Sequence, residues 1–303
     1  MGDLVRIPLG NGTEIDGYLA RPAGEDRVPG VVVLHEIWGL NEDMREVSQR
    51  IAAQGYAVVA PDLYSHGNKA ICLTRVMSEL RHLGDGQVAT DIARTRSWLA
   101  DQPGVDGERV GIIGFCMGGG FALAAAARGG FAAVSTNYGG VPPKDRLGGT
   151  CPVVGSYGAL DKVFVKEGEK LEAWLDELGI PHDVKVYEGV GHSFMTKGGG
   201  PAVLTRLPNP MKPGYSQPEA DDAWERVFRF FDEHVRGAPT VAEELAASRA
   251  AGAPPEEKVA GSDLAERQAE AILEESEERT FDRDAAPGTH LERRTSDETV
   301  APD

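Results

Sequence analysis

The stretch GFCMGGG, residues 114–120, joins two segments with opposite structural preferences. Residues 109–113 (RVGII) are typical of a buried β-strand, and residues 121–127 (FALAAAA) are typical of a helix. A strand that turns at once into a helix forces the residue at the turn, Cys116, into a strained backbone, and the flanking glycines avoid a collision there. The sequence therefore predicts a sharp turn that lifts the Cys116 thiol above the edge of a sheet.

This turn has the form G-x-nucleophile-x-G, with cysteine in the nucleophile position. It also places the backbone N–H of Met117 at a helix start, where unpaired donors and the helix dipole favour an anion. The alternative is a Gly-rich junction around a buried, inert cysteine. We favour the nucleophile, because the remaining partners follow along the chain in the matching order.

Short apolar segments alternate with helical patterns through the first 237 residues. After an N-terminal hairpin at residues 3–8 and 14–20, strands are expected at residues 28–34, 56–60, 109–113, 132–138, 152–157 and 182–187. Helices are expected at residues 42–54, 73–83, 87–101, 121–127, 165–178 and 219–235. This alternation predicts a mostly parallel, doubly wound α/β sheet with helices on both faces.

The composition argues against several classes of protein. The chain has 303 residues, of which 41% are hydrophobic, enough for one large α/β domain or two smaller ones. A net charge of −17 without a basic region argues against nucleic-acid binding, and no apolar run reaches the ~20 residues of a membrane helix. Three irregularly spaced cysteines and the absence of a signal-peptide pattern predict a cytoplasmic protein. The sequence leaves open whether it is a monomer or a small homo-oligomer.

Four polar residues each follow the end of a predicted strand: Glu36, Cys116, Asp161 and His192. Because right-handed crossovers place these loops along one edge of a parallel sheet, we expect the four side chains to gather there. Scattered structural residues would not be expected to share one edge. No Cys or His cluster has metal-ligand spacing and no Gly-rich loop has a phosphate-binding pattern, so neither a metal nor a cofactor is expected.

The residues Cys116, Asp161 and His192 follow the nucleophile–acid–histidine order of the α/β-hydrolase fold. A thiol, whose unperturbed pKa is about 8.5, needs a base near neutral pH. His192 would accept the thiol proton, and Asp161 would fix the histidine tautomer. The N–H groups of Ile37 and Met117 would form the oxyanion hole.

Simpler explanations exist for both acids. Asp161 by itself could be a helix N-cap. Glu36 could be a plain loop carboxylate, although an acid that directly follows an apolar strand is costly to bury unless it is paired. The other two cysteines, Cys72 and Cys151, are expected to be inert.

Two segments fit no regular element. Residues 196–218 are rich in Gly and Pro and begin close to His192, so they form either a lid or pocket wall or a disordered loop, and we favour the first. Residues 238–303 contain one aromatic residue and 17 acidic against 7 basic residues, too little apolar surface to offset chain entropy. We therefore expect a folded domain over residues 1–237 and a disordered acidic tail, with a docking segment for an unknown partner as the alternative for the tail.

Five motifs together resemble the dienelactone hydrolase family over about residues 12–236: HEIWGLN (35–41), APDLY (60–64), GFCMGG (114–119), the turn at Asp161, and GHSF (191–194). The resemblance implies an α/β-hydrolase fold and a carboxylic ester hydrolase that opens a small enol-lactone through a thioester acyl-enzyme. It also implies that Glu36 holds the resting thiol and helps to generate the thiolate when substrate binds. His192 would then activate water for deacylation.

The resemblance further implies arginines that bind a substrate carboxylate, one of them four residues after the catalytic histidine. This sequence has Thr196 at that position, and the other arginine falls near Arg75 or Arg81. The candidates for substrate binding are therefore Lys197, Arg75, Arg81, Trp38 and Tyr138.

Three functions are compatible with these observations. The first is a cysteine-dependent hydrolase of small lactones or esters. The second is a broad esterase or thioesterase whose pocket is remodelled by residues 196–218. The third is a non-catalytic binding or scaffold protein with a vestigial turn, and the intact set of four polar residues argues against it.

Overall fold

The computed structural model describes residues 2–10, 12–24, 27–80, 83, 86–198 and 209–237. The strands are β1 (Gly2–Pro8), β2 (Glu14–Ala20), β3 (Val28–Leu34), β4 (Ala57–Pro61), β5 (Val105–Phe115), β6 (Val134–Asn137), β7 (Val153–Gly158) and β8 (His182–Tyr187). The helices are α1 (Glu42–Ala52), α2 (Lys69–Leu80), α3 (Gln87–Ala100), α4 (Met117–Ala126), α5 (Val165–Leu178) and α7 (Gln217–Phe231). A 3-10 helix, η1 (Lys144–Gly149), and a π-helical turn, η2 (Asp232–Arg236), complete the described elements.

The eight strands form one sheet in the order β1-β2-β4-β3-β5-β6-β7-β8. β1 and β2 form the predicted antiparallel hairpin, and β2 also pairs antiparallel with β4. From β4 to β8 all neighbours are parallel, and in the central strand Val32 pairs with Val59 on one side and Ile112 on the other. All the loops that follow these parallel strands therefore leave the sheet at the same edge.

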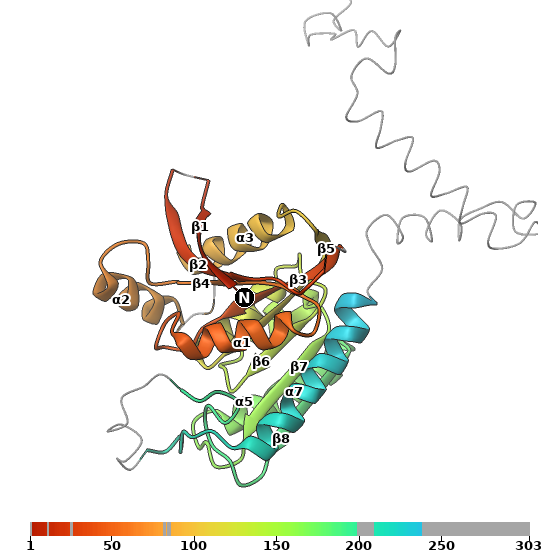
Figure 1. Cartoon of the computed structure of the whole chain (residues 1–303). Helices are drawn as coiled ribbons and strands as arrows, with labels where there is room; N and C mark the ends of the chain where they lie inside the picture. The colour runs from red at the N-terminus through yellow and green to blue at the C-terminus, as the bar shows by residue number, and fades with distance from the viewer. Residues whose placement is uncertain are drawn as a thin grey trace, which may run out of the picture. The chain divides into compact units, whose positions relative to one another are not determined.

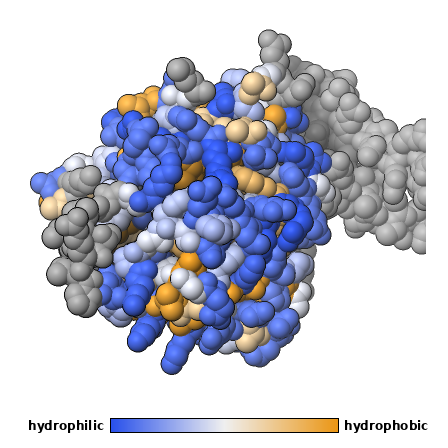
Figure 2. Space-filling view, turned by 60° about the horizontal axis from the view of Figure 1, so that its bottom comes forward, coloured by the Kyte–Doolittle hydropathy of each residue, from blue (hydrophilic) through white to orange (hydrophobic). Residues whose placement is uncertain are grey.

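Helices cover both faces of the sheet, and each face has its own apolar core. One core contains Val76 of α2, Leu123 of α4 and Leu171 of α5, together with side chains of α3. On the other face α1 and α7 lie side by side (Figure 1), and the Arg50 guanidinium lies 4.9 Å from the ring centroid of Trp224. The predicted doubly wound sheet is confirmed. Figure 2 shows a mainly hydrophilic outer face with small, separate apolar areas.

The strand β3 shows why a continuous apolar sequence is found in the middle of this sheet. Alternate residues of β3 enter opposite cores, with Val31 and Val33 on one face and Val32 and Leu34 on the other. A strand covered by helices on both faces needs an apolar residue at every position. β3, α5 and β8 have the predicted bounds.

Other elements differ from their predicted bounds. β5 begins at Val105 instead of residue 109, and α4 begins at Met117 instead of residue 121. α2 spans Lys69–Leu80 instead of residues 73–83, and the last predicted helix divides into α7 and η2. The predicted tail and residues 199–208 of the predicted lid lie outside the described residues. Within the described part of the chain, no helix combines the length and apolarity required to cross a bilayer.

Candidate active site

Cys116 lies at a strained turn between β5 and α4. Its backbone φ is +54°, a left-handed conformation that is rare for a residue with a side chain. A Cβ on Gly114 would overlap the carbonyl of Gly118, and a Cβ on Gly118 would overlap the carbonyl of Leu34. The predicted reason for the two glycines is therefore confirmed. The same close packing explains why three glycines with low helix propensity follow Met117 in the first turn of α4.

Asp161 and His192 meet because the loops after β7 and β8 are joined through their backbones. Leu160 N–H donates to the Val190 carbonyl at 2.9 Å, and a Cβ on Gly158 would overlap the backbone of the second loop. His192 Nδ1 then lies 2.6 Å from Asp161 Oδ2, with both side chains almost completely buried. A carboxylate at this distance holds the proton on Nδ1 and leaves Nε2 as the basic nitrogen.

The second oxygen of Asp161 has a structural role. Its Oδ1 accepts the N–H groups of Val163 and Phe164 at 3.0 and 3.2 Å, just before α5 begins. Asp161 thus caps the turn and pairs with His192 at the same time. The N-cap of α5 itself is Phe164, so Asp161 binds the turn before the helix and not the helix start, and its catalytic role stays a prediction.

The environment of His192 favours its protonated form. Burial alone lowers the pKa of His192, but the hydrogen bond to Asp161 and the adjacent Cys116 thiol outweigh it and raise the pKa to about 10. Nε2 is buried and makes no hydrogen bond of regular geometry to a described residue, and the Cys116 thiol is close enough to interact with the imidazole. The imidazole can therefore take and hold a proton at Nε2.

Glu36 is buried beside the His192 loop, with 3% of its surface exposed. Its Oε1 accepts hydrogen bonds of 2.9 Å from the hydroxyls of Ser193 and Thr196. Ser193 has a φ of +56°, so a strained residue supplies one of these donors. Burial raises the pKa of Glu36, while the two hydroxyls and the nearby His192 act in the opposite direction.

Tyr138 lies behind the imidazole. Its side chain is fully buried, its ring centroid is 5.0 Å from that of His192, and its hydroxyl lies 3.2 Å from Thr196 Oγ1. Because Thr196 donates to Glu36, Tyr138 completes a chain of hydroxyls that ends at the carboxylate. Its role in substrate binding stays a prediction.

The two predicted oxyanion donors are the backbone N–H groups of Ile37 and Met117. Within the described ranges, neither Ile37 N–H nor Met117 N–H donates a hydrogen bond to the protein. Tyr64 joins the two residues, because its hydroxyl lies 3.1 Å from the Ile37 carbonyl and 3.5 Å from Met117 Sδ. Ile37 and its neighbour Trp38 are each 38% exposed.

The three basic candidates for substrate binding lie in two separate parts of the chain. Lys197 is exposed, and its Nζ is paired with Glu46 of α1 at 2.8 Å. Arg75 lies on α2, and its Nε and Nη2 atoms are buried without a hydrogen-bond partner among the described residues. Arg81 lies outside the described residues.

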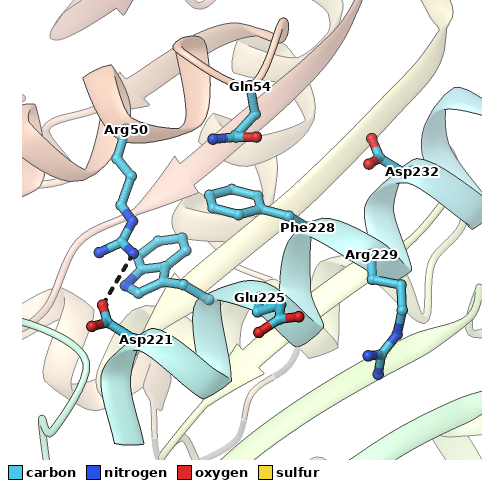
Figure 3. Close-up of a pocket in the computed structure, with 8 residues that line it drawn as sticks. Arg50, Gln54, Asp221, Glu225, Phe228, Arg229 and Asp232 are labelled. Atoms are coloured by element: carbon cyan, nitrogen blue, oxygen red, sulfur yellow. Dashed lines mark ion pairs between the residues drawn. The ribbon is translucent and has the colours of Figure 1, made fainter. Parts of the chain in front are cut away.

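A hollow of about 580 Å³ lies away from these residues, between α1 and α7 (Figure 3). Its lining consists of Arg50, Gln54, Asp221, Trp224, Glu225, Phe228, Arg229 and Asp232. Arg50 points toward Asp221, with an N–O distance of 3.6 Å, and none of the predicted site residues lines the hollow. In the described part of the chain no group of His, Cys, Asp or Glu is placed to hold a metal ion.

Sequence analysis did not predict the contacts that four residues make with the candidate site: His35, Tyr64, Ser193 and Thr196. Each acts through a contact with a residue far away in the sequence or with the backbone. The only available signal was the position of Ser193 and Thr196 beside the candidate histidine. Nothing in the sequence indicates that their hydroxyls reach Glu36.

The strand order, the strained turn after β5 and the acid–histidine pair after β7 and β8 define an α/β-hydrolase fold. The chain belongs to the dienelactone hydrolase family, whose sequence profile matches residues 15–235. It is therefore a hydrolase of esters or lactones that acts on a small-molecule substrate.

Individual relatives agree with this assignment. The chain is 28% identical to a Synechocystis protein named "Putative carboxymethylenebutenolidase", over 77% of this chain and 97% of the relative. It is 29% identical to a carboxymethylenebutenolidase of Rhodococcus opacus, over 74% of this chain and 88% of the relative. A crystal structure from Klebsiella pneumoniae, described as a "Putative Dienelactone Hydrolase", is 27% identical with a TM-score of 0.63 and covers 76% of this chain and 98% of that one.

Proposed function

We propose that this protein opens small enol-lactones through a thioester on Cys116, with His192 as the base and Asp161 as its orienting acid. The observation that carries the proposal is the 2.6 Å contact between Asp161 and His192, formed at the sheet edge where β5 ends in the strained Cys116 turn. A buried imidazole whose Nδ1 is held by Asp161 and which has the Cys116 thiol beside it is suited to proton transfer.

The reaction has two halves. His192 Nε2 takes the Cys116 proton, and the thiolate attacks the lactone carbonyl, whose oxygen becomes an oxyanion held by the N–H groups of Ile37 and Met117. Collapse of this intermediate forms the thioester and expels the ring oxygen, which takes the proton from His192. Water then attacks the thioester with His192 as the base, and the thiolate leaves and regains its proton.

Glu36 is proposed to assist the formation of the thiolate. Its carboxylate is buried close enough to His192 for the imidazole to lower the pKa of Glu36. The hydroxyls of Ser193 and Thr196 hold the carboxylate there. A buried carboxylate is a stronger base than an exposed one, because burial penalises its charged form. This agrees with a role in taking up a thiol proton when substrate excludes water.

Arg75 is the better candidate for binding an anionic substrate. Its Nε and Nη2 are buried and have no partner in the described structure, whereas Lys197 is already paired with Glu46. An arginine fork can bind a carboxylate with two parallel hydrogen bonds. We propose that Arg75 contributes the positive charge for a substrate carboxylate.

A broad esterase is the second candidate function, favoured by a different observation. Several large apolar side chains in or beside the proposed site loops are exposed: Ile37, Trp38, Leu160, Val163 and Tyr215. Such a rim can accept a neutral, apolar ester without any ionic contact. The relative rates on anionic lactones and on neutral esters of similar size decide between the two functions.

The test is the hydrolysis of a chromogenic ester and of a carboxylated lactone by Cys116→Ala. We expect kcat to fall at least about 1,000-fold with an unchanged melting temperature, since the nucleophile is lost and the fold is not. Cys151→Ala, which removes another partly buried thiol, is the matched control and should retain full activity. If Cys116→Ala keeps a tenth of the activity, the covalent mechanism is wrong.

A further inference from the structure

Two buried aromatic side chains outside the proposed catalytic set hold the loop after β3. His35 is fully buried and Tyr64 is 3% exposed, and their ring centroids are 5.0 Å apart. The reaction proposed above assigns no role to either side chain. Both contact the backbone of residues 36–37, the segment that carries one of the two proposed oxyanion donors.

The contacts of His35 fix its tautomer. Leu63 N–H, which can only donate, points to His35 Nε2 at 3.1 Å, so Nε2 is the acceptor. The ring proton is therefore on Nδ1, which donates to the Glu36 carbonyl at 2.6 Å. Gly39 N–H donates to the same carbonyl at 3.1 Å. Two donors from different sides thus hold one carbonyl.

This carbonyl belongs to the same peptide unit as Ile37 N–H. A peptide unit is planar and trans, so its C=O and N–H point in opposite directions. Fixing the Glu36 carbonyl therefore fixes the direction of Ile37 N–H. His35 acts on the backbone donor without approaching the substrate.

Tyr64 fixes the next peptide unit. Its hydroxyl lies 3.1 Å from the Ile37 carbonyl and 3.5 Å from Met117 Sδ, so it joins the two residues whose N–H groups face the oxyanion. Burial, together with the charges of Asp62 and Cys116, raises the pKa of Tyr64, which keeps the hydroxyl a donor at all relevant pH values. Both peptide units that flank Ile37 Cα are thus held by buried side chains.

We propose that His35 and Tyr64 are positioning residues that aim Ile37 N–H into the oxyanion hole. The inference rests on the proposed function, because it presumes an oxyanion at this edge of the sheet. Preorganised donors give the largest part of such stabilisation, and the loss of one donor typically lowers kcat by about 100- to 1,000-fold. A donor that is misdirected and not lost should cost less, about 10- to 100-fold.

Two substitutions of His35 separate this role from simple packing. His35→Asn can place an amide N–H where Nδ1 is and keep the bond to the Glu36 carbonyl, whereas His35→Gln can keep only the acceptor for Leu63. We expect His35→Gln to lower kcat about 10- to 100-fold with KM nearly unchanged. His35→Asn should retain kcat to within about threefold. Equal losses in the two variants, or a greater loss in His35→Asn, would overturn the proposal.

Two inhibitors give a second measurement on the same variants. A trifluoromethyl ketone forms a tetrahedral adduct that needs the oxyanion hole, whereas iodoacetamide needs only the thiolate. We expect His35→Gln to bind the ketone at least tenfold more weakly while Cys116 is alkylated at the wild-type rate. If alkylation slows as much as ketone binding weakens, His35 acts on the thiol and the proposal fails.

Tyr64→Phe keeps the ring and removes the hydroxyl, so it remains informative if His35→Gln does not fold. We expect kcat to fall about fivefold, again with KM and iodoacetamide reactivity unchanged, and wild-type kcat would contradict the role of Tyr64. Failure of the proposed function itself has a different signature, namely ester hydrolysis that survives in Cys116→Ala.

Discussion

The reacting side of the site and its substrate side are built in different ways. Cys116, Asp161 and His192 are held by backbone contacts between loops of the parallel strands, so tightly that glycines are required at the crossings. Of the residues proposed to bind substrate, Lys197 makes an exposed ion pair with Glu46, and Arg75 belongs to helix α2, which is separate from those loops.

This difference teaches which properties of the enzyme are fixed by the fold. Backbone overlap cannot be relieved by a rotamer change, so the reacting groups permit few substitutions. An exposed ion pair such as Lys197–Glu46 contributes little to stability, because solvent screens it, and it can be replaced without disturbing the fold. On the proposed function, the reaction class would be set by the sheet, and the substrate would be set by side chains that can vary.

Asp161→Asn is expected to have the largest effect. The amide cannot hold His192 with its proton on Nδ1 in the same way, so kcat should fall about 1,000- to 10,000-fold. Asp91→Asn is the matched control, because Asp91 is also fully buried and lies 2.6 Å from His66. Comparable losses of kcat in the two variants would show that Asp161 matters only for stability.

Glu36→Gln should slow acylation about 100-fold while leaving the fold intact. Because burial raises the pKa of Glu36, the stability from its neutral form is present at low pH and is lost as the pH rises through the folded pKa. Glutamine is neutral throughout, so the melting temperature at pH 8 should equal or exceed that of the wild type. Stopped-flow burst kinetics measure acylation, and an unchanged burst would make Glu36 a plain loop carboxylate.

Arg75→Met and Lys197→Met compare two candidates on the substrate side. We expect KM for a carboxylated lactone to rise about tenfold in Arg75→Met and less than twofold in Lys197→Met, since Lys197 is already paired. KM for a neutral ester should not change in either variant. A larger effect of Lys197→Met would move the carboxylate site to the loop after His192.

The smallest expected effect is on the pH dependence of stability. The pKa of His192 is raised to about 10, so its contribution to stability is complete below about pH 6.5 and is lost as the pH rises through 10. The difference in melting temperature between wild type and Asp161→Asn should therefore shrink by a few degrees between pH 7 and pH 10. Thermal unfolding at closely spaced pH values measures this change. A difference in melting temperature that stays constant with pH would mean that Asp161 does not raise the pKa of His192.

The sequence predicts the sheet because local patterns and tertiary packing agree there. The continuous apolar strand at residues 28–34 and the alternating strand at 182–187 have the predicted bounds. The start of α4 was predicted too late, since three glycines disfavour a helix by intrinsic propensity and tertiary packing overrides that preference. The long Gly- and Pro-rich segment offers no comparable pattern.

The acid–histidine pair could be predicted because its members occupy strand ends, a position that topology brings together. The support around it could not, because His35, Tyr64 and Thr196 act through single hydrogen bonds to groups brought near only by folding. Substrate binding by Lys197 stays a prediction, since its Nζ is paired with Glu46. Proximity in sequence to His192 does not indicate where a long, exposed side chain points.

The most direct test of the account is the mass of the enzyme during turnover. Rapid acid quenching of the protein with a slowly hydrolysed ester, followed by peptide mass analysis, should find the acyl group on the peptide that contains Cys116. The adduct should be absent in Cys116→Ala. Turnover without an acyl adduct in the wild type, or an adduct on Cys151 in its place, would contradict the proposed thioester mechanism.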